Sequence, residues 1–473
     1  MKSILSDLAA EIDKLPEYSV FGRVTAVLGM MVEIGGVERA LSIGDRVLLR
    51  RKRGDRVVCE VVGFKEGRAL AMPFSGLEGV GIGSEAEITD GDPVIYPNET
   101  WLGRVVDAMG NAIDDKGPLS DGARGYAIRG TPPPAHKRER LGEKIDVGVR
   151  AINTFATMCH GQRMGVFSGS GVGKSILMSM IARFTSSEVN VIGLVGERGR
   201  EVQEFIQDYL GEEGLSRSVI VASTSDESPL MRRQAAYMTL AIAEAFRDAG
   251  KNVMCMMDSV TRFAMAQREI GLASGEPPAS KGYTPMVFSE LPKLLERAGP
   301  GIKGTGTITG LFTVLVEGDD HNEPISDAVR GIIDGHIVLD RSIADKGRYP
   351  AIDVLKSVSR MMPDCNTREE NEIVGRGRAL LAAYEEMADM IRLGAYKRGS
   401  DPQLDEAIKY YPSLEKFLSQ DKNERAGLAE CYTELSALLE MTGPEFAPEL
   451  EVNNVEEDPL SAEVTSPEQT QPN

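Results

Sequence analysis

A glycine-rich segment at residues 168–175 constrains the fold of this chain more than any other feature. It reads Ser-Gly-Ser-Gly-Val-Gly-Lys-Ser, and it lies between the apolar run Met164 to Phe167 and the helix-forming run Ile176 to Ala182. Glycines let consecutive backbone N–H groups approach an anion closely, and the positive end of the following helix dipole points to the same place. A strand, a glycine-rich turn and a helix in this order predict a phosphate-binding loop.

Two side chains of this loop supply a charge and a metal ligand. The Lys174 ammonium would contact the β- and γ-phosphates of a nucleotide, and the Ser175 hydroxyl can ligate Mg²⁺. One position departs from the motif G-x-x-x-x-G-K-[ST], because Ser168 stands where the first glycine is expected. That position opens the loop, so a small residue is tolerated there. We expect the nucleotide to contact Gly169, Ser170, Gly171, Val172, Gly173, Lys174, Ser175 and Ile176.

Apolar runs alternate with helical patterns after the loop. The strand candidates are residues 189–195, 219–222, 253–257, 308–316 and 336–339. Nearly continuous apolar strands between helices are typical of a parallel sheet that is covered on both faces. The pattern therefore predicts an α/β domain, which begins near residue 96 with a strand and turn around residues 103–114.

Two carboxylates follow predicted strands of this sheet. Glu197 comes directly after the run 189–195, where a carboxylate can polarise the water that attacks a γ-phosphate. Asp258 ends the run 253–257, where an acid in a phosphate-loop protein holds Mg²⁺, mostly through water. Each has a plainer alternative. The charges around Glu197 also suit a helix start, and Asp is a common turn former at strand ends.

The N-terminal part of the chain has a different character. Short β-type runs at 20–24, 31–34, 46–49 and 57–62 are separated by glycine turns, which predicts a small β-barrel over residues 19–95. The basic run Arg50 to Arg53 is interpreted as a solvated hairpin end, since no aromatic ladder accompanies it as in an RNA-binding surface. Residues 1–18 carry apolar side chains at helical spacing, so this helix either packs on its own domain or docks a partner protein.

The C-terminal part is predicted to be helical, followed by an acidic tail. Residues 363–443 hold two apolar stripes at helical spacing, which we interpret as core. Beyond Gly443 and Pro444 the chain contains no Lys or Arg and is rich in Pro, Glu, Ser and Thr, so we expect residues 444–473 to be disordered.

Composition limits the environment and the class of partner. The formal net charge is −19, which argues against broad nucleic-acid binding, although part of this charge belongs to the tail. The five cysteines are dispersed without a C-x-x-C pair, which is typical of reduced thiols in a cytosolic protein. We find no membrane-span pattern, and acid follows the N-terminus too early for a signal peptide.

A segment from Tyr349 to Arg360 carries a specific resemblance. Its residues 350–359 read Pro-Ala-Ile-Asp-Val-Leu-Lys-Ser-Val-Ser, which resembles the signature of the family containing the rotary ATP synthase α and β subunits and the type III secretion ATPases. Segments 258–266, 275–283 and 327–336 resemble the export ATPases of this family, the flagellar ones most. The resemblance runs from about residue 20 to residue 440. It implies a RecA-like ATPase core over 96–362, between the barrel and a helical domain over 363–443.

The resemblance also implies roles for individual residues. Glu197 corresponds to the water-activating carboxylate, and Arg198 to a γ-phosphate ligand. Arg360 corresponds to an arginine finger that reaches the neighbouring subunit's site. The family's non-catalytic subunits carry an uncharged residue at the position of Glu197, so we expect this chain to turn over ATP.

The resemblance also implies which residues contact the cofactors, ATP and Mg²⁺. Tyr349 is expected to stack on the adenine, and Ser175 and Asp258 are expected to hold the metal. Lys174 is assigned both to catalysis and to nucleotide binding.

The function implied by the resemblance is ATP hydrolysis by a homohexameric ring. This hydrolysis would energise protein export through a type III secretion apparatus, and we expect that apparatus to be the flagellar one. The implied location is the cytoplasm, peripherally at the inner face of the membrane. The implied partners are a coiled-coil stator or regulator at the N-terminal helix, a central stalk protein at the loop 275–283, export substrates with their chaperones, and the membrane export gate. No nucleic acid is expected.

Other functions remain open at the level of sequence. A virulence type III secretion ATPase and a catalytic subunit of a proton-translocating ATP synthase share the same chemistry, although the segment 258–263 argues against the synthase. A ring-shaped RNA translocase of the transcription-terminator kind would need a basic, aromatic-lined barrel, and residues 19–95 contain few aromatics. A non-hydrolysing interaction subunit is opposed by Glu197.

Overall fold

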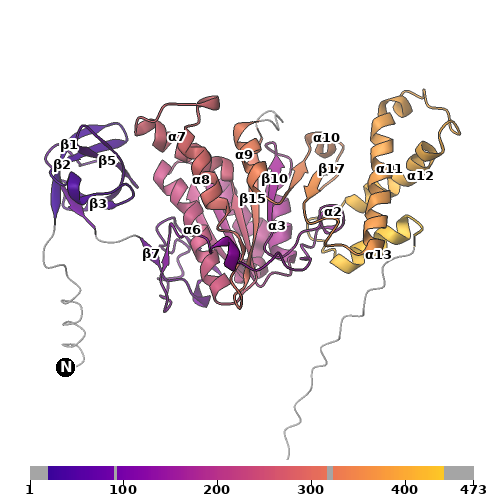
Figure 1. The fold of residues 1–473 in the computed structure, drawn as a ribbon, viewed down its shortest axis with the longest axis horizontal. Helices are drawn as coiled ribbons and strands as arrows, with labels where there is room; N and C mark the ends of the chain where they lie inside the picture. The colour runs from indigo at the N-terminus through magenta and orange to yellow at the C-terminus, as the bar shows by residue number, and fades with distance from the viewer. Residues whose placement is uncertain (1–19, 90–92, 317–322, 442–473) are drawn as a thin grey trace, which may run out of the picture.

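The computed structural model describes residues 20–89, 93–316 and 323–441, which form a barrel, an α/β body and a group of helices arranged in a row along the molecule (Figure 1). This architecture confirms the predicted fold class. The helix predicted for residues 1–18 and the tail predicted for 444–473 lie outside the described residues.

The N-terminal body is a closed six-stranded barrel with the strand order β1-β2-β5-β4-β3-β6. Its strands are β1 (Phe21–Leu28), β2 (Met31–Gly35), β3 (Arg46–Arg50), β4 (Arg56–Lys65), β5 (Arg68–Pro73) and β6 (Glu85–Ile88). Alternate side chains point inward, so Val47 and Leu49 of β3 are fully buried. The basic run lies at the turn between β3 and β4, as interpreted from the sequence, and Arg51 there pairs with Asp55 at 2.7 Å.

The central body is a mostly parallel sheet with the order β17-β16-β10-β15-β13-β11-β12-β8. Its strands are β8 (Arg104–Val106), β10 (Arg163–Ser168), β11 (Val189–Glu197), β12 (Ser218–Thr224), β13 (Val253–Asp258), β15 (Thr307–Leu315), β16 (Gly335–Leu339) and β17 (Ile352–Ser359). Only the outermost strand β17 and the short β14 (Gly299–Pro300) run antiparallel among the described strands of this sheet. The short strands β7 (Val94–Ile95) and β9 (Tyr126–Ala127) pair apart from it.

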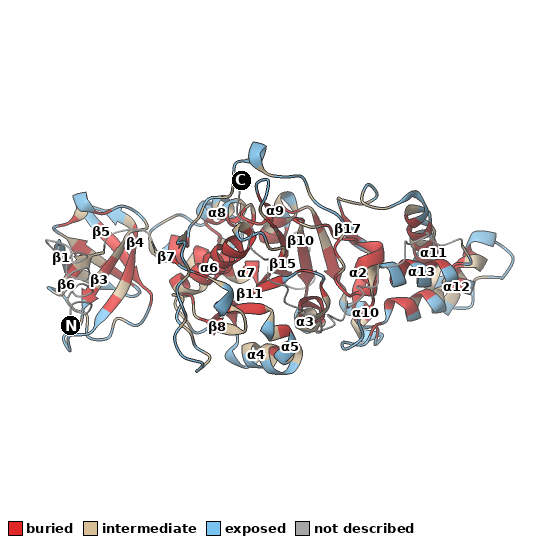
Figure 2. Ribbon diagram, turned by 90° about the horizontal axis from the view of Figure 1, so that it is seen from below, coloured by how far each residue is buried: buried red, intermediate tan, exposed pale blue. Residues whose placement is uncertain are grey.

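Helices cover both faces of the sheet, so its strands are buried on each side (Figure 2). Within β11, Ile192 packs in one apolar core and its neighbour Val191 in the other. This explains the continuous apolar runs in the sequence. The helices of this body are α2 (Arg150–Phe155), α3 (Lys174–Phe184), α4 (Gly199–Glu204), a π-helix η4 (Phe205–Leu210), α5 (Gly211–Ser216), α6 (Pro229–Asp248), α7 (Val260–Ala273), α8 (Pro285–Leu295), α9 (Pro324–Ile332) and α10 (Arg341–Asp345). Short 3-10 turns are η1 (Glu38–Ala40), η2 (Glu99–Trp101), η3 (Ala135–Lys137) and η5 (Ser280–Gly282).

The C-terminal body consists of α11 (Arg368–Arg392), α12 (Pro402–Leu418) and α13 (Leu428–Leu438). The helix α11 begins with a capping box, in which Thr367 and Glu370 satisfy each other's backbone N–H groups. Residues predicted as apolar stripes, such as Leu380 and Leu435, are buried in the same core as α2 and α3. The helices are therefore packed onto the α/β body.

A buried polar cluster joins the barrel to the α/β body. Glu60 of β4 is 3% exposed, and its carboxylate accepts hydrogen bonds from Arg129 at 2.5 Å and from Arg233 of α6 at 2.7 Å. Next to it, Arg46 of β3 donates to Gln234 of α6 at 2.7 Å. These contacts fix how the barrel lies on the body that follows it.

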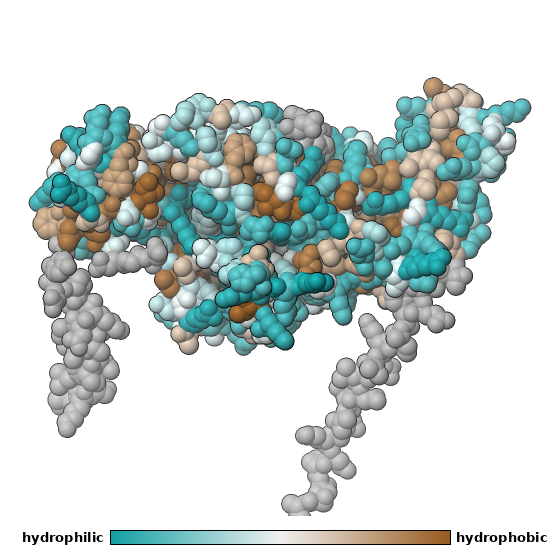
Figure 3. Space-filling view, in the orientation of Figure 1, coloured by the Kyte–Doolittle hydropathy of each residue, from teal (hydrophilic) through white to brown (hydrophobic). Residues whose placement is uncertain are grey.

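The face shown in Figure 3 is mainly hydrophilic, and apolar side chains appear on it as separate patches. Within the described part of the chain, no helix combines the length and the hydropathy that a membrane span requires.

Candidate functional site

The glycine-rich loop connects β10, which ends at Ser168, to α3, which begins at Lys174. Gly171 and Gly173 have φ angles of 77° and 93°, in the left-handed region that favours glycine. A Cβ atom at Gly173 would also lie 3.5 Å from the ring of Tyr349. The backbone conformation of the turn therefore requires glycine at these two positions. The turn ends where α3 begins, so its backbone N–H groups lie beside the N-terminus of that helix.

A cavity of about 730 Å³ opens at this loop, at the carboxyl ends of β10, β11 and β15. Ligands of open α/β sheets bind at this edge. The cavity is lined by Gly169, Ser170, Gly171, Gly173, Lys174, Ser175, Ile176, Glu197, Arg198, Glu201, Tyr209, Thr261, Arg262, Met265, Leu315, Val316, Arg341 and Tyr349. Val172 was expected to contact the nucleotide but does not line the cavity, because its side chain is buried in the core.

Lys174 lies between the two predicted carboxylates. Its ammonium forms an ion pair with Asp258 and lies 3.8 Å from Glu197. Asp258 is 3% exposed and also accepts a hydrogen bond from Thr313 at 2.8 Å. Strands β11 and β13 are neighbours in the sheet, so their ends bring together acids that are 61 positions apart in the sequence. The two acids therefore hold the Lys174 ammonium at the cavity, where the phosphates of a bound nucleotide would contact it.

The environment of Glu197 suits a group that exchanges protons near neutral pH. Burial and the negative charge of Asp258 raise the pKa of Glu197 to about 7, and Lys174 opposes part of this rise. The Oε1 atom of Glu197 is buried; the Lys174 ammonium lies 3.8 Å from it, and no atom of the described residues forms a hydrogen bond with it. A buried carboxylate oxygen without a partner costs free energy, which a water molecule beside a bound phosphate would recover.

Arg198 and Tyr349 also line the cavity. The Arg198 side chain is 77% exposed, and it pairs with Glu201 of α4 at 3.5 Å. Tyr349 is 46% exposed and lies against Gly173. Both side chains are thus partly exposed at the cavity.

Arg360 is not brought to this cavity. It is exposed at the end of β17, on the outer edge of the sheet, and its guanidinium donates to the carbonyl oxygen of Arg330 at 3.3 Å. Of the predicted catalytic residues, Lys174, Glu197 and Arg198 therefore meet in one chain, whereas Arg360 lies apart from them.

Two arginines of the site were not predicted from the sequence. Arg341, at the start of α10, donates to the carbonyl oxygen of Ser170 at 3.0 Å and closes the loop from one side. Arg262, in the first turn of α7, lies beside Gly196 and lowers the pKa of Glu197 against the effect of burial. Both follow the end of a predicted strand by a few residues, which is the one sequence signal that could have identified them.

The residues present fit a magnesium–nucleotide complex. Among the described residues, no cluster of three or more His, Cys, Asp or Glu side chains could hold a metal ion alone. Mg²⁺ at phosphate sites keeps several waters and takes only one or two protein ligands besides the phosphates. Ser175 lines the cavity and Asp258 lies behind Lys174, which matches a direct hydroxyl ligand and a carboxylate that acts through water.

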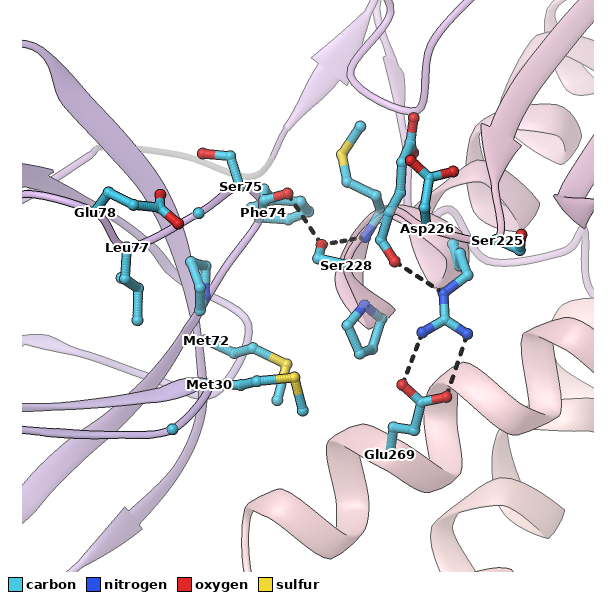
Figure 4. A pocket seen from close by; sticks show the side chains of 17 residues that line it. Met30, Met72, Phe74, Ser75, Leu77, Glu78, Ser225, Asp226, Ser228 and Glu269 are labelled. Carbon is cyan, nitrogen blue, oxygen red and sulfur yellow. Dashed lines mark hydrogen bonds and ion pairs between the residues drawn. The ribbon is translucent and has the colours of Figure 1, made fainter. Parts of the chain in front are cut away.

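A second cavity, of about 820 Å³, lies between the barrel and the α/β body (Figure 4). Met30, Met72 and Phe74 face it from the barrel, and Arg232 on its other side forms a two-point ion pair with Glu269 at 2.7 and 3.2 Å. Its arginine is already paired with an acid, and its glycines, Gly29 and Gly76, belong to the barrel and do not lead into a helix, so it lacks the glycine-rich loop of a phosphate site.

Comparison with known proteins agrees with this geometry. Residues 148–359 match the ATP synthase alpha/beta family, nucleotide-binding domain, and residues 366–437 match the T3SS EscN ATPase C-terminal domain. The flagellum-specific ATP synthase of Caulobacter vibrioides is 54% identical over 441 residues, which cover 92% of this chain and 99% of that protein. The protein of the same name from Bacillus subtilis is 50% identical and is covered to 98%.

Solved structures give the same result. The assembled ATPase EscN from the type III secretion system of enteropathogenic E. coli superposes with a TM-score of 0.81 at 37% identity, covering 88% of this chain and all of that one. EscN in complex with its central stalk EscO gives a TM-score of 0.80. The chain therefore belongs to the ATP synthase alpha/beta family, in the branch that includes the flagellum-specific ATP synthases and the type III secretion ATPases.

Proposed function

We propose that this chain is a Mg²⁺-dependent ATPase that energises protein export through a flagellar type III secretion apparatus and works as a ring of identical subunits. The observation that carries the proposal is the buried pair of Lys174 and Glu197 at the mouth of the glycine-rich loop. A cation for the phosphates and a carboxylate with a raised pKa lie within reach of one γ-phosphate position.

The catalytic steps assigned to this chain use few side chains. When ATP enters, the Lys174 ammonium exchanges Asp258 for the β- and γ-phosphates. The Glu197 carboxylate then orients the attacking water and takes its proton, and its raised pKa of about 7 makes it a proton acceptor near neutral pH. Bound Mg²⁺ supplies charge that neutralises the phosphate oxygens. Tyr349 stacks on the adenine, and Arg198 turns to the γ-phosphate.

Arg360 is assigned to the site of the neighbouring subunit. Its exposed position at the sheet edge leaves the guanidinium available to another chain. A planar, permanently charged guanidinium suits phosphate oxygens in the transition state. We propose a hexameric ring, in which each active site is completed in this way.

The export role rests on the names and assemblies of the relatives. Among the partners, a central stalk protein is supported by the EscN–EscO complex. The loop 275–283, between α7 and α8, is its proposed contact. We further propose that a stator or regulator binds residues 1–18 and that export substrates bind together with their chaperones. The proposed location is the cytoplasm, beside the membrane export gate. We propose domain limits at 19–95, 96–362 and 363–443.

The direct test of the enzymatic proposal is the substitution Glu197→Gln. The amide keeps the shape of the side chain but cannot accept a proton, so turnover should fall about 10²–10⁴-fold while ATP binding persists. The matched control is Glu204→Gln, because this acid lies on α4 outside the cavity and, among the described residues, pairs with Arg200. Unchanged turnover in Glu197→Gln would exclude the assigned base.

The test of the export role uses the bacterium that encodes the chain. Cells that carry Glu197→Gln should secrete no flagellar filament protein, whereas the synthesis of ATP by their membranes should be unaffected. Normal secretion, or loss of membrane ATP synthesis, would contradict the proposed role in export.

A further inference from the structure

Two of the five cysteines lie together at the junction of the α/β body and the C-terminal helices. Cys159 is buried in the segment between α2 and β10, and Cys365 is half-buried in the segment between β17 and α11. Their thiols are hydrogen-bonding neighbours, although the residues are 206 positions apart in the sequence. The other three cysteines are also buried: Cys59 on β4, Cys255 on β13 and Cys431 on α13.

Other contacts hold the two segments side by side. The backbone of Cys159 bridges to Lys144, and the Lys144 ammonium donates to Glu370 in the first turn of α11 at 2.6 Å. The Thr157 hydroxyl contacts Tyr432 at 3.1 Å, and the Lys144 ammonium lies over the ring of the same tyrosine. The two segments that carry the thiols are thus joined by a polar network that crosses the junction.

The same network reaches Cys365 itself. The Tyr432 hydroxyl donates to the Asn366 side-chain oxygen at 3.2 Å, and the Cys365 thiol lies 3.5 Å from the same oxygen. The contact between the two thiols therefore belongs to an ordered local network.

The electrostatics differ between the two sulfur atoms. The hydrogen bond from Cys159 and the positive charge of Lys144 lower the pKa of Cys365, against the effect of burial. The same hydrogen bond and burial raise the pKa of Cys159. Burial raises the pKa of Cys431 to about 12, so that thiol stays protonated. Cys365 is the thiol that is suited to react first, with Cys159 in position to respond.

We propose that Cys159 and Cys365 form a redox switch, which closes to an intrachain disulfide under hydroperoxide and slows ATP turnover. The slowing rests on the proposed function, whereas the disulfide chemistry does not. A bond here would tie the start of α11 to the α/β body. It would also fix the segment that follows Arg360, where the Cys365 N–H already bonds the Met361 carbonyl oxygen at 2.9 Å.

The reaction balances with one hydroperoxide per pair. The Cys365 thiolate attacks the O–O bond, which breaks to give a sulfenic acid and, with hydrogen peroxide, one water. The Cys159 sulfur then attacks the sulfenic sulfur, and its proton leaves with the hydroxyl group as the second water. Two thiols are oxidised by two electrons to one disulfide, and the peroxide is reduced.

The test treats the full-length protein with hydrogen peroxide and then alkylates it under denaturing conditions. The number of free thiols per chain should fall from five to three, and peptide mapping without reductant should recover residues 159 and 365 in one disulfide-linked peptide pair. ATP turnover should fall with the same time course and return after dithiothreitol. If the reduced protein shows no ATP turnover before peroxide is added, that result would contradict the proposed function but would not bear on the disulfide.

The variants separate the pair from general oxidation. Cys365→Ser should keep its turnover under peroxide, and Cys159→Ser should accumulate sulfinic acid at Cys365, because the resolving thiol is missing. Cys431→Ser is the matched control and should behave like the wild type. Sulfinic acid at Cys365 in the wild type, a linkage to another chain, or an intrachain disulfide with unchanged turnover would each overturn the switch.

Discussion

At the scale of single residues, the protonation of Glu197 should govern the pH dependence of catalysis. A general base works in its ionised form, and the pKa of Glu197 is raised to about 7 by burial and by Asp258. The value of kcat/KM should therefore rise as pH increases through about 7 and level off above it. Measured between pH 5.5 and 9, a profile that is flat across neutral pH would contradict the assignment.

Lys174 is expected to be essential for nucleotide binding. Lys174→Ala removes the cation and leaves Glu197 and Asp258 as a buried pair of acids facing the phosphates, so binding should be lost together with hydrolysis. Titration with a fluorescent ATP analogue measures this directly. The exposed Lys137→Ala serves as the control and should bind normally. Retained affinity in Lys174→Ala would show that the nucleotide binds elsewhere.

The sequence could predict those site residues that lie in the loop or at strand ends. Glu197 and Asp258 follow apolar runs, and parallel strands end at one edge, so the alternation places both acids at the same edge of the sheet. That β11 and β13 are neighbours there follows only from the observed strand order. Arg341 and Arg262 also follow strand ends by a few residues, but their contacts with Ser170 and Gly196 depend on how α10 and α7 are placed, which the sequence pattern does not give. Arg360 was assigned by resemblance alone, and one chain leaves it outside the cavity.

At the scale of elements, the cluster around Glu60 should stabilise the junction between β4 and α6. Burial alone would raise the pKa of Glu60, but its ion pairs with Arg233 and Arg129 outweigh burial and lower it. Glu60→Gln leaves two arginines without their acid, which should cost about 3–5 kcal/mol of unfolding free energy. Glu33→Gln, which breaks an exposed pair with Arg68 in the same barrel, should cost about 1 kcal/mol or less.

The pH dependence of that loss provides a further check. Because the pKa of Glu60 is lower in the folded state, its contribution is complete above the ordinary value of 4.5 and is lost as pH falls through the folded value. The difference between the wild type and Glu60→Gln in urea unfolding should therefore shrink below pH 4.5. A constant difference would mean that the charge of Glu60 does not stabilise the junction.

Strands that form uninterrupted apolar runs in the sequence were predictable, whereas strands that mix buried and exposed side chains were not. The runs behind β11, β13 and β15 are apolar throughout because both sheet faces are covered. The strand β17 was not predicted as a strand, since it lies antiparallel at the edge and exposes part of one face, including Val358. The strands β5 and β6 were also missed individually, although the barrel was predicted from its neighbours.

At the scale of the whole molecule, the order of barrel, α/β body and helices was predicted, but their packing was not. The barrel is held by Glu60 and Arg233, which are 173 positions apart, and no local pattern encodes such a contact. The same limit applies between subunits. The separation of Arg360 from Glu197 within one chain is what a site shared between two copies requires.

Mixing two inactive variants tests this central claim most directly. Arg360→Ala keeps the loop, and Lys174→Ala keeps the finger, so each protein alone should hydrolyse ATP very poorly, with a loss of about 10³–10⁵-fold expected for a missing finger. In mixed rings, some interfaces combine an intact Lys174 with an intact Arg360 from the other chain. The mixture should regain part of the wild-type turnover and lose it on dilution. A mixture that demonstrably co-assembles but stays inactive would contradict the shared site.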